Sequence, residues 1–195
     1  MSTVLEPRSS GGQRLLTAAD LAAMPAELPS GSVKYELDDG KLVLMAPPGD
    51  DHGRMQSRVV FALTNHAENI GLGECRGEIG VILRRNPDRI VAPDAAFIAN
   101  RSLPVRKSPE GYLETIPELV VEVRSKNDAV TELREKVAEY LAAGVQIVWV
   151  IDPRSQAVTV YRQGQNTSEL RIGDALTAEG VIPGFQVPVA ELFDR

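Results

Sequence analysis

The chain has 195 residues, of which 43% are hydrophobic and 25% charged, a composition typical of one soluble globular domain. Its single cysteine, Cys75, excludes an intrachain disulfide and a cysteine-based zinc site. The net charge of −6 disfavours a basic nucleic-acid coat protein, but it is compatible with a nucleic-acid enzyme whose acids hold a metal.

No stretch of the sequence reaches the roughly 18 unbroken apolar residues of a membrane-spanning helix. The first residues also lack the apolar core of a secretory signal. We therefore expect a cytoplasmic protein that has no membrane partner.

The N-terminal part of the chain predicts a tail, a helix, a hairpin and a second helix, in that order. Residues 1–14 are polar and rich in Gly and Ser, which is typical of a disordered tail, and residues 15–195 are expected to form a single domain. A short helix should begin after an N-cap at Thr17. Two alternating runs over residues 34–46 indicate a hairpin, and apolar residues at helical spacing indicate a helix over residues 51–71.

The second half alternates strands with one long helix. Three strand-like runs come first, at residues 77–85, 90–100 and 118–125. Pro93 within the second run suggests a bulge or a bent, edge-like segment. A helix over residues 129–144 and a buried strand over residues 145–152 should form a parallel crossover with the third run. A paired strand over residues 157–163 and short strands beyond it complete an α/β domain with a mixed sheet.

Acidic residues interrupt these apolar strands. Glu122 lies within ELVVEV, where a buried carboxylate costs roughly several kcal/mol unless a cation, hydrogen bonds or a metal compensates it. Because strand side chains alternate, Glu122 and Arg124 share one face. Asp94 is a second acid in a neighbouring apolar run, and Glu36 is a third in the predicted hairpin.

Two explanations for these acids stay open at the level of the residues. Acids that lie close together repel one another unless a divalent cation binds them, and Mg²⁺ prefers carboxylate oxygens with water and phosphate. Alternatively, each acid pairs with an arginine, as Glu122 could pair with Arg124, and no metal binds.

The chain resembles a known group of nucleases at several places. Pro93-Asp94 followed by Glu122-x-Arg124 is similar to the bipartite signature of the PD-(D/E)XK nuclease superfamily. The segments YELDDGKLVLMAPP, VAPDAAF, PELVVEVRS, EKVAEYLAAGV and VWVIDP occur in the order of the Uma-type family of bacterial putative restriction endonucleases, over residues 15–193. The resemblance implies a restriction-endonuclease-like core, a mixed β-sheet flanked by helices with an N-terminal β-hairpin, that binds Mg²⁺ or Mn²⁺.

The resemblance also implies roles for single residues. Asp94 and Glu122 match the metal-binding acids, Glu36 matches an acid of the first hairpin, and His52 matches a histidine after the Pro-Pro break. The superfamily's lysine would fall at position 124, but this chain has Arg124, which cannot act as a base.

Relatives of this kind carry the lysine on the following helix, which points to Lys136. A solvated lysine paired with Glu132 or Glu139 is the alternative for Lys136. Arg124 could compensate Glu122 or contact phosphate, and Tyr140 could line the site or simply pack. His52 could be a ligand, a phosphate contact or a partly exposed imidazole in the capping turn.

The first functional hypothesis is a metal-dependent endonuclease that hydrolyses DNA phosphodiester bonds, with Asp94, Glu122, Lys136 and Glu36 as its catalytic residues. His52, Arg124 and Tyr140 would be accessory groups, and a homodimer is expected because nucleases that cut both strands often act as two-fold pairs. The alternative is a non-cleaving nucleic-acid-binding or regulatory module with the same fold, which the acidic charge and Arg124 favour.

Overall fold

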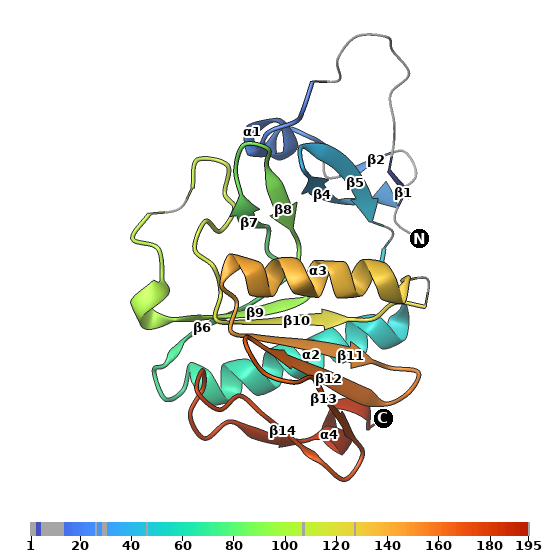
Figure 1. Ribbon diagram of the computed structural model, residues 1–195, viewed down its shortest axis with the longest axis vertical. Coiled ribbons are helices and arrows are strands. Elements are labelled where there is room, and N and C mark those ends of the chain that lie inside the picture. Colours follow the sequence, from blue (N-terminus) through green and yellow to red (C-terminus); the bar gives the residue numbers. More distant parts are fainter. Residues whose placement is uncertain are drawn as a thin grey trace. The chain divides into compact units, whose positions relative to one another are not determined.

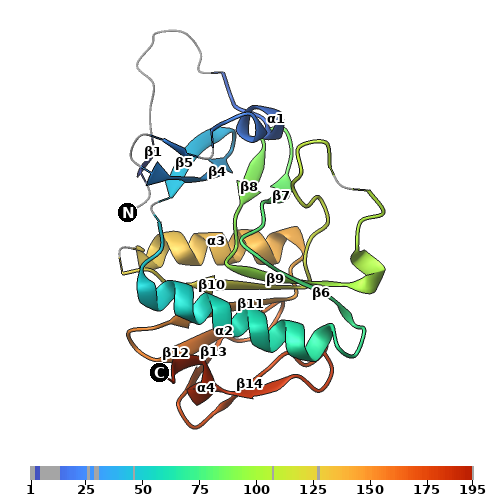
Figure 2. The same cartoon turned by 180° about the vertical axis from the view of Figure 1, so that it is seen from behind.

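The computed structural model describes residues 3–4, 14–25, 27–28, 31–45, 47–106, 108–126 and 128–194. The chain forms two compact units, whose elements are labelled in Figures 1 and 2. The small unit comprises Met1–Pro47, Gly80–Ala92 and Pro104–Thr115, and the large unit comprises Pro48–Ile79, Pro93–Leu103 and Ile116–Arg195. Most of the predicted tail, residues 1–14, lies outside the described residues, and the single domain over residues 15–195 stays a prediction.

The small unit is built on a five-stranded sheet of order β1-β5-β4-β8-β7. Its strands are β1 (Thr3–Val4), β4 (Lys34–Asp38), β5 (Lys41–Met45), β7 (Val81–Arg84) and β8 (Arg89–Val91), with a separate pair β2 (Glu27–Leu28) and β3 (Gly31–Ser32). The antiparallel β4–β5 pair confirms the predicted hairpin, which turns through two residues with positive φ, Asp39 and Gly40. Helix α1 (Ala18–Ala22) begins at the predicted N-cap Thr17, whose side chain forms a capping box with Asp20.

The large unit contains a six-stranded mixed sheet of order β13-β12-β11-β10-β9-β6. Its strands are β6 (Gly73–Gly77), β9 (Ala95–Ala99), β10 (Leu119–Val123), β11 (Ile147–Asp152), β12 (Ala157–Arg162) and β13 (Ser168–Arg171). β10 and β11 pair in parallel, whereas the other neighbours in this sheet are antiparallel. Helix α3 (Val130–Ala143) connects the two parallel strands, which confirms the predicted crossover, and it ends at Gly144 with a φ of 110°.

Helices cover both faces of this sheet, with α3 in front of it in Figure 1 and α2 (Asp50–Ala67) in front of it in Figure 2. Met55, Val59 and Leu63 of α2 share one buried core with Val121 and Trp149 of the sheet. The remaining elements are the 3₁₀ helix η1 (Asn100–Ser102), the pair β14 (Ala175–Thr177) and β15 (Gln186–Pro188), and α4 (Val189–Phe193). No helix among the described residues has the length and apolar character needed to span a bilayer.

The structure corrects one prediction for the run over residues 90–100. This run is not one bent, edge-like strand, since β8 ends at Val91 in the small unit's sheet and β9 begins at Ala95 inside the large unit's sheet. Pro93 lies at the break because it has no N–H group with which to continue a ladder. Helix α2 is also shorter than predicted, because it ends at Ala67 and a turn leads from there to Gly71.

Candidate active site

Asp94 is fixed from several sides immediately before β9. Its backbone N–H donates to the carbonyl of Val121 at 3.1 Å, and its Oδ2 accepts the N–H of Val123 at 2.6 Å. Its own carbonyl accepts the side-chain amide of Gln56 at 3.0 Å and the N–H of Glu78 at 3.3 Å. The acid is buried, and these bonds hold its carboxylate against the end of β10.

Glu122 is also buried, near the end of β10, and α3 supplies its partners. The ammonium of Lys136 lies 3.0 Å from its Oε1, and the hydroxyl of Tyr140 donates to the same oxygen at 2.6 Å. The Lys136 side chain is only 14% exposed, so it is not the solvated lysine of the alternative interpretation. A cation and a hydrogen bond therefore compensate the carboxylate whose burial would otherwise be costly.

The strand register brings the two acids to one place. Ala95 lies opposite Val121 and Ala96 lies opposite Val120 in the antiparallel β9–β10 pair. The ladder ends at the Ala95–Val121 pair, and Asp94 and Glu122 are the next residues of the two segments, so both acids lie at the same end of the β9–β10 pair.

His52 approaches Asp94 from the first turn of α2. Its Nε2 lies 3.1 Å from Oδ2 of Asp94, and its side chain is 11% exposed. The histidine belongs to the first turn of α2, as one interpretation of the sequence expects, and its imidazole also contacts a buried carboxylate. The large unit thus holds two contact groups at the same end of the β9–β10 pair, His52 with Asp94, and Lys136 and Tyr140 with Glu122.

Arg124 has a different partner from the one that the sequence suggests. Its guanidinium donates to Oδ2 of Asp152 at 2.8 Å, and its N–H donates to the carbonyl of Ile151. Burial pushes the pKa of Asp152 upward, but hydrogen bonds from the N–H of Arg154 and from Arg124 outweigh it and leave that pKa below its ordinary value. Arg124 therefore forms its ion pair with an ionised Asp152. The cation that contacts Glu122 and compensates its charge is Lys136.

Glu36 belongs to the small unit, where it is buried in β4. Its Oε1 accepts the N–H of Ala92 at 2.9 Å, and its Oε2 lies 3.6 Å from the guanidinium of Arg89. Both of these contacts lie within the small unit. A role for Glu36 in one metal site with Asp94 and Glu122 therefore stays a prediction.

The comparisons with known proteins now decide the family. A model of the Uma2 family, described as putative restriction endonucleases, matches residues 19–190. The chain belongs to the Uma2 family. This result confirms the resemblance stated from the sequence motifs.

A solved structure similar to this Uma2 chain supports the fold. The crystal structure of a putative nuclease belonging to DUF820 from Anabaena variabilis is 20% identical, with a TM-score of 0.74 over 91% of this chain and 97% of that one. A cryo-electron microscopy structure of a DrdV–DNA complex is 16% identical, with a TM-score of 0.36 over 74% of this chain and 93% of that one. No curated protein matches the chain.

The side chains of the candidate site have the chemistry that Mg²⁺ or Mn²⁺ requires. Among the residues that the structure describes, no group of three or more His, Cys, Asp or Glu side chains is placed to hold a metal. Mg²⁺ does not need one, because one or two carboxylates with waters and substrate phosphate complete its shell. Asp94 and Glu122 offer two buried carboxylates at the same end of the β9–β10 pair, which suits this kind of site.

Two residues of the site region escaped the sequence analysis of this Uma2 chain. Gln56 is buried and holds the carbonyl of Asp94, and Asp152 holds Arg124. A polar residue on the buried face of α2 was the available signal for Gln56. For Asp152 the signal was its position at the carboxyl end of β11, the parallel neighbour of β10.

Cys75 takes no part in this chemistry. Burial, aided by the charge of Glu68, raises the pKa of its thiol to about 12. The thiol therefore stays protonated near neutral pH and is not a nucleophile.

Proposed function

We propose that this protein is a metal-dependent endonuclease that hydrolyses DNA phosphodiester bonds. One observation carries the proposal: the ammonium of Lys136 contacts Glu122 beside the strand end that Asp94 occupies. In this proposal two acids and an amine from three separate segments would serve one site. Phosphoryl transfer needs a cation site and a positively charged group that stabilises negative charge on the phosphate. Two acids and an amine can supply both.

Asp94 and Glu122 would hold Mg²⁺ or Mn²⁺, and Glu36 would complete or orient the set. The bound ion would supply Lewis-acid stabilisation of the phosphoryl oxygens and would lower the pKa of a water molecule. The hydrogen bond from Val123 and the contacts of Lys136 and Tyr140 fix both acids before any ion arrives, so little reorganisation is needed.

The other side chains act on the substrate and on the proton. Lys136 would orient the attacking water and stabilise negative charge on the phosphate. His52, within 3.1 Å of Asp94, would hold or pass a proton, and Arg124 would contact a phosphate oxygen through donors that Asp152 does not use. Tyr140 would position Glu122.

Cleavage of plasmid DNA with Mg²⁺, Mn²⁺ or no metal tests the proposal. We expect metal-dependent nicking that Asp94→Asn, Glu122→Gln and Lys136→Met each reduce by about 100-fold or more. Arg171→Ala, which changes an exposed residue of β13, should leave the rate unchanged. Absence of nicking by folded wild-type protein with any of these metals and any DNA would contradict the proposal.

A second candidate is a non-cleaving nucleic-acid-binding or regulatory module, and Arg124 at the place of the superfamily lysine favours it. The net charge of −6 points the same way. Binding of Mn²⁺, followed by the ion's electron paramagnetic resonance signal, without cleavage of any nucleic acid would support this candidate. We further propose that the protein acts in the cytoplasm. We also propose that it is a homodimer, because nucleases that cut both strands often act as two-fold pairs.

A further inference from the structure

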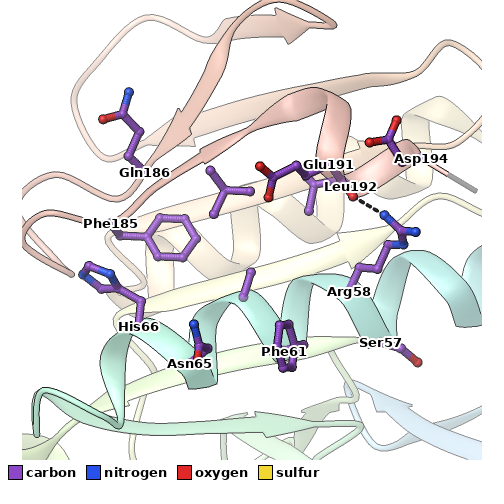
Figure 3. A pocket seen from close by; sticks show the side chains of 12 residues that line it. Ser57, Arg58, Phe61, Asn65, His66, Phe185, Gln186, Glu191, Leu192 and Asp194 are labelled. Carbon is purple, nitrogen blue, oxygen red and sulfur yellow. Dashed lines mark hydrogen bonds between the residues drawn. The ribbon is translucent and has the colours of Figure 1, made fainter.

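An apolar groove lies on the large unit, formed by α2, β15 and α4. Its volume is about 570 Å³. Phe185, Val187 and Leu192 line it from the C-terminal segment, and Ala62 lines it from α2. Figure 3 shows Phe185 and Leu192 across the groove from α2, and Phe61 on α2 beside the groove.

An exposed aromatic ring stands at the rim of this groove. Phe61 is 70% exposed, although a Phe side chain is normally buried. Ser57, Phe61 and Asn65 repeat every four residues and form one outward stripe along α2 beside the groove. A large exposed apolar side chain next to an apolar hollow is typical of an interaction surface.

The projecting ring and the hollow lie on one face, which is what a two-fold interface requires. In such an interface the same patch meets itself, so each copy must present both a knob and a hole. Phe61 of one copy can enter the groove of a second copy while the second copy does the same in return. A partner of another kind would need a hollow of its own for Phe61.

The charges around the groove are also self-complementary. Arg58 contributes a positive charge, and Glu191 and Asp194 contribute negative charges. Arg58 donates to the main-chain carbonyl of Glu191, so the carboxylate of Glu191 is not its partner in that bond. Two acids among three charged residues disfavour a nucleic-acid strand, whereas two copies can set Arg58 of one against Glu191 of the other.

We propose that this face, called here the Phe61 face and formed by Ser57, Arg58, Phe61, Asn65, Leu192 and Glu191, is the homodimer interface of the protein. The occupant of the groove is the Phe61 ring of a second copy. The proposal names the surface through which two copies would associate and does not depend on nuclease chemistry.

Sedimentation velocity of the full chain at increasing micromolar concentrations tests the interface. Wild type should sediment as a dimer, and Phe61→Asp should sediment as a monomer, since the new carboxylate would have to enter an apolar groove. Ile70→Asp is the matched control, because Ile70 is 58% exposed but does not line the groove. Circular dichroism and thermal unfolding of Phe61→Asp should match wild type, because the ring contributes little to the monomer's core.

A charge exchange makes the test sharper. Arg58→Glu alone and Glu191→Arg alone should each weaken self-association at least tenfold, because like charges would then meet across the two-fold axis. An equal mixture of the two variants should restore a dimer, in which every pair is again opposite in sign. A wild type that stays monomeric, a Phe61→Asp variant that stays dimeric, or a mixture that fails to associate would each overturn the proposal.

Discussion

Lys136 and Tyr140 lie one turn apart on α3 and contact the same atom, Oε1 of Glu122. The ammonium also lies 6.0 Å from the centroid of the Tyr140 ring, within the range of a cation–π contact. One helix turn therefore supplies both the charge and the hydrogen bond that stabilise a carboxylate in the middle of a sheet. Loss of either partner should therefore change both the free energy of unfolding and the affinity of the protein for metal.

Lys136→Met should lower the free energy of unfolding by about 3 kcal/mol, because removal of one partner leaves a buried carboxylate without its cation. Mn²⁺ should restore more stability to this variant than to wild type, since the ion would replace the missing positive charge. Urea unfolding with and without Mn²⁺ measures both effects. Arg134→Met, at an exposed position of the same helix, should change neither value. An equal gain from Mn²⁺ in Lys136→Met and in wild type would show that the ion does not replace the lysine charge, and no gain in either protein would contradict the metal site.

Gln56→Met should cost about 1–2 kcal/mol, because the variant keeps the side-chain volume but removes a donor from a buried carbonyl. Since that carbonyl belongs to Asp94, we also expect weaker Mn²⁺ binding by about tenfold. Thermal unfolding and metal titration check the two effects separately. A loss of stability with unchanged metal affinity would show that Gln56 serves the core alone.

Asp152 should make stability depend on pH. Its pKa is lower in the folded state than its ordinary value of 3.8, so its stabilising effect is present above 3.8 and is lost as the pH falls through the folded-state pKa. Asp152→Asn should therefore be less stable than wild type near neutral pH, and the difference should shrink in acid. Urea unfolding across this range measures it, and a difference that does not depend on pH would count against the ion pair with Arg124.

Cys75 should react very slowly with a disulfide reagent such as dithionitrobenzoate while the protein is folded. A thiol whose pKa is about 12 is almost entirely protonated near pH 8, and the thiolate is the reactive form. Absorbance of the released thiol measures the rate, and the unfolded chain in urea provides the fast reference. Fast reaction in the folded protein would show that the thiol is less buried than described.

Local patterns in the sequence were enough to predict several parts of the fold. The β4–β5 hairpin, the N-cap at Thr17 and the β10–α3–β11 crossover each depend on alternation, capping residues or a terminal glycine within a short window. Alternation also placed Glu122 on the face of β10 opposite the one that carries Val121 and Val123 in the core.

The features that were missed depend on contacts between distant segments. The passage from β8 to β9 at Pro93 is set by two separate sheets. Strand β6 reads as Gly-Glu-Cys-Arg-Gly, which has no β-branched or aromatic residue to indicate a strand. The partner of Arg124 was also misjudged, because Asp152 reaches it only through the parallel pairing of β10 with β11. No pattern within one segment reports such a pairing.

The crossover helix has a consequence for how such proteins can diverge. A parallel strand pair cannot close without a segment that passes over the sheet, and in this chain that obligatory segment also delivers Lys136 to Glu122. An amine can therefore migrate between strand and helix during evolution while the backbone stays as it is. Lineages with either placement would share one architecture, and a signature read along a single strand would overlook those that carry the amine on the helix.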